Sequence, residues 1–331
     1  MKKIVVFILN YRAISFLKDG SLNSTILAAK NIKDAKVNLV FLDNYSMDGS
    51  VEYVLKNNPE VDVLVSPRNY MYCRGINVGL QYIYKRYKPD YYILVDADNY
   101  CEPNTYDELV KFAILNKRAG LVQPLVKNSL DKNILYSCGH HYIDDIFCRP
   151  LREIPSDKKQ LIDLPSCSIS STLVKAEVFE KCGLLDPIFE LYYESSDLSF
   201  RSRKAGFSCA CHMSAVSYND GAKVSEVNNF HEGYYRNRNG LIFWKKHDEN
   251  VYQKLLQIQL SVYDKLNDKL NKTEYGLGII DESTRRGIEE GIRITSNLGV
   301  FEERVVRLDE YNKTDAVLLQ SGSFIANKKN E

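Results

Sequence analysis

Short apolar runs alternate with helical patterns over the first 126 residues, and this alternation constrains the fold more than any other feature. The apolar runs have the length of strands and lie at residues 4–9, 37–42, 61–65, 91–95 and 121–126. Runs of this kind are typical of strands that are covered on both faces. Segments with helical spacing separate several of them, after residues 48–50, at 76–84 and after 103–104. The pattern predicts an α/β fold with a mostly parallel central sheet.

The pattern changes twice further along the chain. Residues 127–165 have the character of loops and short strands, and order resumes with a strand at 166–174 and a helix at 176–182. Long helical patterns follow at 234–247, 250–270 and 282–294. We therefore expect one α/β unit over residues 1–247 and a helical C-terminal extension over residues 248–331.

Composition excludes several classes of function. The chain carries 44 Lys and Arg against 43 Asp and Glu, which argues against a broad basic surface for nucleic acid. The first apolar run ends at Asn10 without a cleavage site and predicts a strand, and no apolar run approaches the ~20 residues of a membrane span. Eight scattered cysteines without a paired CxxC pattern indicate reduced thiols. We therefore expect a cytoplasmic protein that binds no nucleic acid.

Polar residues follow the ends of four successive predicted strands. They are residues 10–12, 43–50, 66–77 and 96–99. In an open parallel sheet the carboxyl ends of the strands meet at one edge, where ligands bind. The sequence therefore predicts a ligand site at that edge.

The residue types at this edge limit the kinds of ligand that it can bind. Neither a GxGxxG turn nor a GxxxxGK[ST] loop is present, so the common dinucleotide and phosphate-loop sites are excluded. Asp96 and Asp98 follow a buried strand, and such a pair can hold Mg²⁺ or Mn²⁺ together with phosphate oxygens. The alternative is that Asp98 and Asn99 only open a turn. The position beside three other polar loops favours the metal.

Six motifs in order carry a resemblance to a known family. They lie at residues 8–11, 43–50, 69–80, 94–98, 192–207 and 234–239. Together they resemble family 2 of the glycosyltransferases, which have the GT-A fold and invert the anomeric carbon, and in particular the rhamnosyltransferase-like members. The resemblance covers residues 4–247. It implies a nucleotide-sugar half over about residues 1–126 and an acceptor half over about residues 127–247.

The resemblance assigns roles to residues of the first half. Those expected to bind the nucleotide sugar are Asn10, Tyr11, Asp43, Arg68, Asn69, Arg74, Asn77 and Asp96. Within this set Asp43 would accept a hydrogen bond from a pyrimidine base, so a UDP- or dTDP-sugar is the expected donor. Arg68 and Arg74 would face the diphosphate, although either could equally be a solvated loop charge. Asp98, with Asp96, would hold Mn²⁺ or Mg²⁺.

An inverting transfer needs a carboxylate base on the acceptor side, because the attacking hydroxyl loses its proton. The family supplies the base from a Glu-Asp pair, and this chain has Glu194 followed by Ser195. The base is then Glu194 or Asp197, and we favour Glu194. Asp197 could instead form an ordinary helix pair with Arg201.

The resemblance also leaves the third metal ligand open. Relatives often carry a His after the acidic helix, and here Asn219, Asp220 or water would take its place. His140 and His141, with two aspartates nearby, lack the ligand spacing of tetrahedral zinc and are interpreted as structural.

The function expected from these residues is a metal-dependent transfer of a sugar to a glycan or lipid-linked glycan, in surface polysaccharide or glycoconjugate assembly. A sugar-nucleotide nucleotidyltransferase is disfavoured, because no Gly-rich loop follows the first strand. A non-catalytic sugar-binding relative is suggested by Ser195. The wide apolar stripe at 251–266 favours packing within the chain or in a homo-oligomer, and the basic residues after Trp244 leave a peripheral membrane contact as an alternative.

Overall fold

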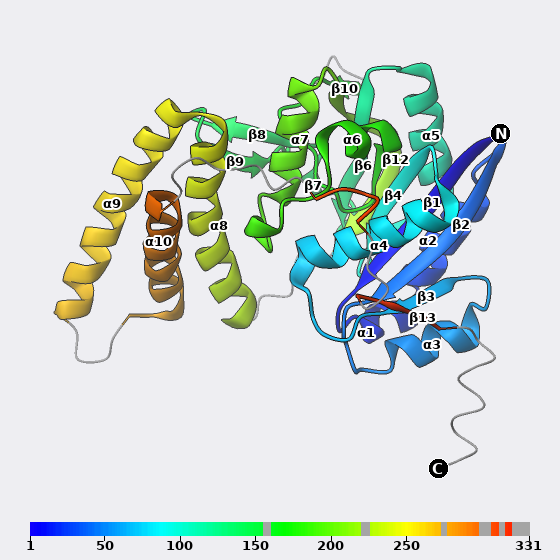
Figure 1. The fold of residues 1–331 in the computed structure, drawn as a ribbon, viewed down its shortest axis with the longest axis horizontal. Coiled ribbons are helices and arrows are strands. Elements are labelled where there is room, and N and C mark those ends of the chain that lie inside the picture. Colours follow the sequence, from blue (N-terminus) through cyan, green and yellow to red (C-terminus); the bar gives the residue numbers. More distant parts are fainter. Residues whose placement is uncertain (155–159, 220–225, 273–276, 298–305, 311–314, 320–331) are drawn as a thin grey trace, which may run out of the picture.

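The computed structural model describes residues 1–154, 160–219, 226–272, 277–297, 306–310 and 315–319. A large twisted sheet lies between helices on both faces, and three long helices stand beside it (Figure 1). The predicted α/β architecture with a mostly parallel central sheet is confirmed.

The parallel part of the sheet comes from the first third of the chain. Its strands are β1 (Lys2–Asn10), β2 (Ala35–Asp43), β3 (Asp62–Val65) and β4 (Tyr91–Asp96), in the spatial order β3-β2-β1-β4. Asn10 pairs with Asp43, and Leu9 pairs with Asp96. The carboxyl ends of these strands therefore meet at one edge, as the sequence predicts.

The second part of the sheet follows β4. β11 (Thr172–Lys175) runs antiparallel between β4 and β6 (Ala119–Asn128), and β12 (Ser208–Asn219) runs parallel to β6. Shorter strands complete this side: β5 (Tyr100–Cys101), β7 (Leu135–Ser137) and β10 (Gln160–Ile162). β8 (His140–Ile143) and β9 (Phe147–Pro150) form a separate two-stranded sheet. Residues 127–165 are thus the region of loops and short strands that was expected.

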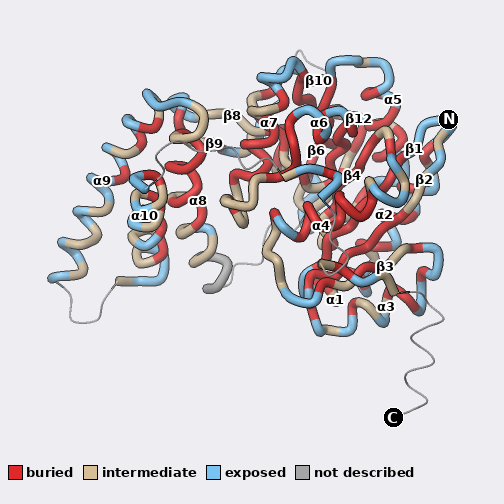
Figure 2. Tube along the Cα trace, in the orientation of Figure 1, coloured by how far each residue is buried: buried red, intermediate tan, exposed pale blue. Residues whose placement is uncertain are grey.

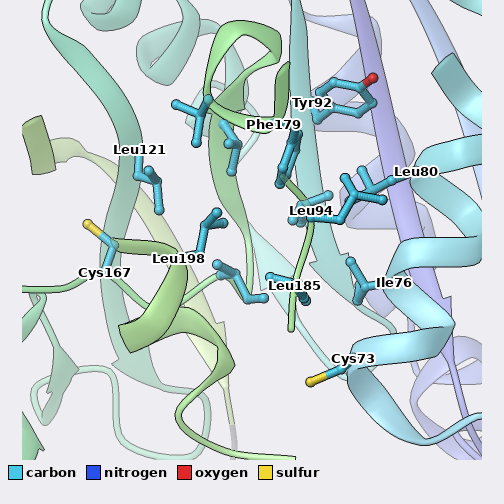
Figure 3. Packing of buried hydrophobic residues seen from close by; sticks show 14 of the residues in the cluster. Cys73, Ile76, Leu80, Tyr92, Leu94, Leu121, Cys167, Phe179, Leu185 and Leu198 are labelled. Atoms are coloured by element: carbon cyan, nitrogen blue, oxygen red, sulfur yellow. The ribbon is translucent and has the colours of Figure 1, made fainter. Parts of the chain in front are cut away.

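Alternation along β1 divides the core between the two faces of the sheet. Ile4, Val6 and Ile8 pack under one set of helices: α1 (Ile14–Lys18), α2 (Ser21–Lys30), α3 (Ser50–Asn57) and α5 (Thr105–Leu115). The intervening residues, including Phe7, pack under α4 (Met71–Tyr87), α6 (Ala176–Cys182) and α7 (Glu194–Lys204). Figure 2 shows both faces buried, and Figure 3 shows the second packing layer. α1 and α2 were not predicted.

One glycine lets α4 approach the sheet closely. A Cβ atom built on Gly79 would lie 2.0 Å from the ring of Phe7 on β1. Because Phe7 is fully buried, the ring has no free space into which it could move. Gly79 therefore fixes the position of α4, whose first turn carries residues of the site described below.

The three long helices are α8 (Glu226–His247), α9 (Glu249–Asn271) and α10 (Ile279–Asn297). They form one bundle, in which a Cβ on Gly287 of α10 would lie 2.3 Å from the backbone oxygen of Tyr234 on α8. The second half of α8 also packs into the α/β unit, where Trp244 donates a hydrogen bond from Nε1 to the Ile146 carbonyl at 2.7 Å. α8 thus belongs to both parts of the fold.

The end of the described chain differs from the helical extension expected over residues 248–331. β13 (Val317–Leu319) pairs antiparallel with β3 at the edge of the large sheet. Leu308 and Ala316 are buried nearby. Edge strands offer unpaired backbone groups, and three residues are too few to carry a periodic signal in the sequence. Within the described residues, no helix combines the length and apolar character that a membrane crossing needs.

Candidate active site

A cavity of about 260 Å³ opens where the carboxyl end of β4 meets the N-terminus of α7, the middle of α8 and the β7–β9 region. Its wall includes Asp96 from the first half of the chain and Glu194 from the second. Two of the predicted site residues therefore share one cavity, although 98 positions separate them in the sequence.

Asp96 ends β4 and is held by an aromatic hydroxyl. Tyr72 of α4 donates a hydrogen bond from Oη to Asp96 Oδ1 at 2.9 Å. Burial raises the pKa of the Asp96 carboxyl, and the hydrogen bonds from Tyr72 and Ser170 partly offset that rise. Tyr72 was not predicted as a site residue, although it lies inside the motif at residues 69–80.

Asp98 lies beside the side-chain amide of Asn99, which in turn contacts Asn219. Asn99 donates from Nδ2 to Ser170 Oγ at 2.6 Å and to Asp98 Oδ1 at 3.4 Å. Asn219, at the end of β12, donates from Nδ2 to Asn99 Oδ1 at 3.4 Å. The strand that follows the acidic helix thus brings Asn219 next to the Asp96–Asn99 turn. Asp220, the other residue considered there, lies outside the described residues.

This donor set fits a hard divalent cation. Carboxylate and amide oxygens are the ligands that Mg²⁺ and Mn²⁺ prefer, and such ions usually complete their shells with water and phosphate oxygens. Among the described residues no group of three or more His, Cys, Asp or Glu side chains is placed to hold a metal.

Glu194 is the first residue of α7 and follows a backbone turn with unusual geometry. Tyr192 and Tyr193 have φ of +64° and +69°, which non-glycine residues rarely adopt and which cluster at functional sites. Glu194 is only 8% exposed, and among the residues that the structure describes its Oε2 has no hydrogen-bond partner. It lines the cavity. The turn therefore places a buried carboxylate in the wall of the cavity.

Burial raises the pKa of Glu194 to about 7, and the nearby Asp96 carboxylate adds to the rise. Backbone N–H groups at the start of α7 and the charge of Arg236 act in the opposite direction. A carboxylate with a pKa near neutrality can take a proton from a hydroxyl far better than an ordinary surface glutamate. The position and the pKa both suit a general base.

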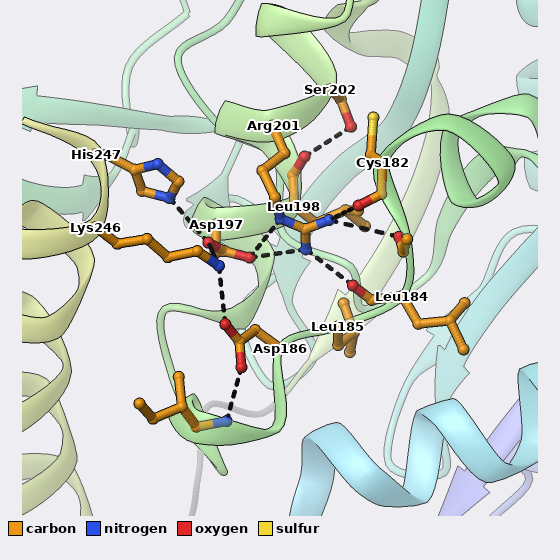
Figure 4. A network of polar contacts seen from close by, with 12 residues as sticks. Cys182, Leu184, Leu185, Asp186, Asp197, Leu198, Arg201, Ser202, Lys246 and His247 are labelled. Carbon is orange, nitrogen blue, oxygen red and sulfur yellow. Dashed lines mark hydrogen bonds and ion pairs between the residues drawn. The ribbon is translucent and has the colours of Figure 1, made fainter. Parts of the chain in front are cut away.

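Asp197 has a different environment, which Figure 4 shows. Its Oδ2 accepts from Arg201 at 2.7 Å, and its Oδ1 lies 2.9 Å from Lys246 Nζ and 2.8 Å from His247 Nε2. Asp197 is fully buried and is not among the residues that line the cavity. These partners hold the pKa of its carboxyl well below the ordinary range.

The structure therefore favours the interpretation of Asp197 as a structural residue, and its role as a second candidate base stays a prediction. A carboxylate that is shared among three cationic or hydrogen-bonding partners has a low affinity for protons. Asp197 instead forms the helix pair with Arg201 that the sequence left as the alternative. Its contacts with Lys246 and His247 also connect α7 to the end of α8.

Three of the predicted donor residues build loops. Asp43 is buried; its Oδ1 accepts from Asn10 Nδ2 at 2.7 Å and its Oδ2 from the Ser46 N–H at 2.9 Å. Asn69 Oδ1 accepts from the Met71 N–H at 2.8 Å at the start of α4. These contacts shape the edge of the sheet, and a carboxylate retains further acceptor sites for a ligand.

The remaining predicted donor residues divide into one buried and three accessible positions. Asn77 is buried and bonds both backbone groups of Leu185, at 2.8 and 3.0 Å, so it ties α4 to the loop before α7. Tyr11, Arg68 and Arg74 are exposed. The Arg68 guanidinium lies 5.0 Å from the ring centre of Tyr70. None of these four lines the cavity.

Several residues of the cavity wall were not predicted as site residues from the sequence: Tyr136, His140, Tyr192 and Arg236. Burial and the charge of Arg236 lower the pKa of His140 to about 4, so its imidazole is neutral at physiological pH. His140 was interpreted as structural. Arg236 lies inside the motif at residues 234–239, which was recognised without a role for this residue.

The family model described as glycosyl transferase family 2 matches residues 7–183. Comparison with curated protein sequences gives no significant match. Similarity to solved structures is extensive but at low identity. A structure of GalNAc-T7 with UDP, GalNAc and Mn²⁺ has a TM-score of 0.57 at 15% identity, over 90% of this chain and 58% of that chain. The present chain thus spans little more than half of its length.

Two further structures resemble the chain over nearly its whole length. The mannosyltransferase PcManGT from Pyrobaculum calidifontis, in complex with GDP-Man and Mn²⁺, has a TM-score of 0.55 at 12% identity, over 99% of this chain and 80% of that chain. S. aureus TarS 1–349 has a TM-score of 0.52 at 11% identity, over 96% of both chains. At these identities the likeness concerns the fold alone.

Proposed function

Because this chain belongs to glycosyl transferase family 2, we propose that it transfers a sugar from a nucleotide-diphosphate sugar to a hydroxyl acceptor, with a divalent metal and inversion of the anomeric carbon. One observation carries the proposal. Asp96, at the carboxyl end of β4, and Glu194, with a pKa near 7 and a carboxylate oxygen that no described residue engages, line the same cavity. An inverting transfer needs these two functions, donor binding and proton removal, within one substrate's reach of each other.

The donor would bind across the carboxyl ends of β1, β2 and β4. Asn10, Asp43 and Asp96 are brought to this edge by the parallel register. Two structures of similar fold were solved with nucleotides or nucleotide sugars, UDP in one and GDP-Man in the other. They support the donor class, and the pyrimidine donors UDP- and dTDP-sugar remain the first choice because Asp43 can accept from a base N–H.

Asp98 and Asp96, with the amide oxygens of Asn99 and Asn219, would hold Mn²⁺ or Mg²⁺. When bound, such an ion neutralises the charge that builds on the leaving nucleoside diphosphate. Both of the nucleotide-bound structures named above also contain Mn²⁺, which supports the choice of metal.

Glu194 would act as the general base. The acceptor oxygen bonds to the anomeric carbon as the bond from that carbon to the diphosphate oxygen breaks on the opposite side. The proton of the acceptor hydroxyl passes to Glu194 Oε2 and then to solvent. Burial of Glu194 serves this step, because it holds the pKa of the carboxyl near the working pH.

A non-catalytic sugar-binding relative is the second candidate, because Ser195 replaces the aspartate of the family's Glu-Asp pair. Among the described residues Oε2 of Glu194 has no hydrogen-bond partner, which supports catalysis over binding alone, since a buried carboxylate oxygen without a partner costs stability and persists where function requires it. We place the enzyme in surface polysaccharide or glycoconjugate assembly, with a hexosyl or deoxyhexosyl donor and a glycan or lipid-linked glycan acceptor.

The test uses the full chain with a panel of UDP-, dTDP- and GDP-sugars, with and without Mn²⁺. Release of nucleoside diphosphate and thermal stabilisation by UDP, dTDP or GDP are measured in parallel. We expect metal-dependent stabilisation by one nucleotide, and turnover that Glu194→Gln abolishes while nucleotide binding persists. Absence of stabilisation by every nucleotide would contradict the donor assignment. Turnover that is unchanged in Glu194→Gln would contradict the base assignment.

A further inference from the structure

One arginine lines the cavity, and two exposed arginines are adjacent to residues of its wall. Arg236 of α8 is part of the wall. Arg149 is an exposed residue of β9 between two wall residues, Cys148 and Pro150. The guanidinium of Arg152 lies 5.7 Å from the ring centre of Tyr136, another wall residue. The chain as a whole has a formal charge of only +1, so this basic group is a local feature.

Arg236 is positioned by an aromatic ring and only weakly engaged by an acid. Its guanidinium lies 4.8 Å from the ring centre of Tyr192. Its Nε donates to Glu232 at 2.8 Å, the one ion pair of Arg236 among the residues that the structure describes, and the Glu232 side chain is 55% exposed. Exposed pairs of this kind contribute little to stability. An incoming anion could therefore replace Glu232 at small cost.

Arg236 also lies within electrostatic range of the base. Its charge lowers the pKa of Glu194, whereas that of Asp96 raises it. All three residues line one cavity. An acceptor whose hydroxyl reaches Glu194 therefore comes close to the guanidinium.

We infer that the acceptor carries a phosphate group close to its reacting hydroxyl, and that Arg236 binds this phosphate with Arg149 and Arg152 beside it. The planar guanidinium fork matches a phosphate with two parallel hydrogen bonds. A neutral sugar would leave this charge without a partner in the cavity. The inference rests on the proposed function, since it names the acceptor class of the same site.

The first probe is glucose 1-phosphate, titrated calorimetrically against methyl glucoside in the presence of EDTA, so that no metal-bridged phosphate contributes. We expect the phosphate to bind at least tenfold more tightly than the neutral sugar. Arg236→Gln should lose at least tenfold in affinity for the phosphate, and Arg236→Lys should recover part of the loss because it keeps the charge without the fork. Arg118→Gln, which removes an exposed arginine paired with Asp163, should bind as the wild type does.

Equal affinity of the wild type and Arg236→Gln for glucose 1-phosphate would overturn the inference. It would also be overturned if the wild type bound methyl glucoside as tightly as glucose 1-phosphate. If Arg236→Gln fails to fold, the double variant Arg149→Gln/Arg152→Gln replaces it, since both residues are exposed; an unchanged affinity there would also overturn the inference. Binding to phosphatidylglycerol vesicles without binding of glucose 1-phosphate would do so as well, because the attraction would then lie outside the cavity.

A second measurement separates this inference from the proposed function. With Mn²⁺ present, Arg236→Gln should still bind UDP, dTDP or GDP, whichever stabilises the wild type. Asp98→Asn should lose that nucleotide and keep glucose 1-phosphate. If no variant binds a nucleotide while phosphate selectivity persists, the proposed function is wrong and Arg236 remains an anion site. If the nucleotide binds and phosphate selectivity is absent, the inference alone is wrong.

Discussion

Replacement of Asp197 by alanine separates a structural role from a catalytic one. In the wild type the carboxylate accepts from Arg201 at 2.7 Å and lies 2.9 Å from Lys246 and 2.8 Å from His247. The Lys246 side chain is 5% exposed, and that of Arg201 is 11% exposed. Asp197→Ala therefore removes a carboxylate partner from two largely buried cations, Arg201 and Lys246. Lys246 still forms its ion pair with Asp186 at 2.8 Å.

Removing one partner of a buried ion pair costs about 3–5 kcal/mol, because the remaining charge stays desolvated without compensation. The unfolding entropy is about 2.1 cal/mol/K per residue. For 331 residues, this free-energy cost corresponds to a fall in melting temperature of about 4–7 °C. The effect also depends on pH. The folded pKa of Asp197 is below its unfolded value of about 3.9, so the stabilisation is complete above that value and is lost as pH falls through the folded pKa.

The assay is thermal unfolding of the wild type and Asp197→Ala between pH 3 and 8, with Arg118→Ala as the control. Arg118 forms an exposed pair with Asp163, so its removal should cost under about 1 kcal/mol. The difference between the wild type and Asp197→Ala should be constant from pH 6 to 8 and should narrow below about pH 4. A fall of less than 2 °C at pH 7, together with loss of transfer in a folded Asp197→Asn protein, would refute the reasoning and restore Asp197 as the base.

Three further predictions concern the cavity and the helical bundle. Transfer should rise with pH with a midpoint near 7, because Glu194 accepts a proton only when ionised, and Glu194→Gln should lower the rate about 10²–10⁴-fold; initial rates from pH 5.5 to 9 check this, and an unshifted profile in a still active Glu194→Gln would contradict it. EDTA should abolish turnover and Mn²⁺ should restore it, and Asp98→Asn should need more Mn²⁺ for half-maximal rate; full activity in EDTA would rule out the metal. Gly287→Ala should lower stability by about 1–3 kcal/mol, because its Cβ would meet the Tyr234 backbone oxygen, whereas a Cβ on Gly278 meets no heavy atom within 4 Å and Gly278→Ala should be neutral; equal melting temperatures would refute the packing argument.

The sequence by itself determined the sheet and the location of its binding edge. Apolar runs of strand length and helical spacing are local signals, and each is set by residues within one element. The polar residues after β1, β2 and β4 could therefore be assigned to one edge before any contact was known. The placement of Asp96 and Asp98 at that edge follows from the same rule.

Only the tertiary structure distinguishes the environments of the two acids of α7. Glu194 and Asp197 are three residues apart, so both belong to the first turn of one helix, and no local pattern separates them. The difference arises from α8: Lys246 and His247 engage Asp197, while Glu194 is left facing the cavity. The role of each carboxylate thus depends on partners about 50 positions further along the chain.

The same reason applies to Arg236 and to β13. Arg236 reaches the cavity only because α8 packs against the turn before α7 and brings its guanidinium over Tyr192. β13 is a strand only because β3 offers an open edge to its three residues. Charge environment and strand pairing depend on which residues lie close together in the folded chain. The sequence gives the identity of these residues, but no local pattern shows that they come into contact.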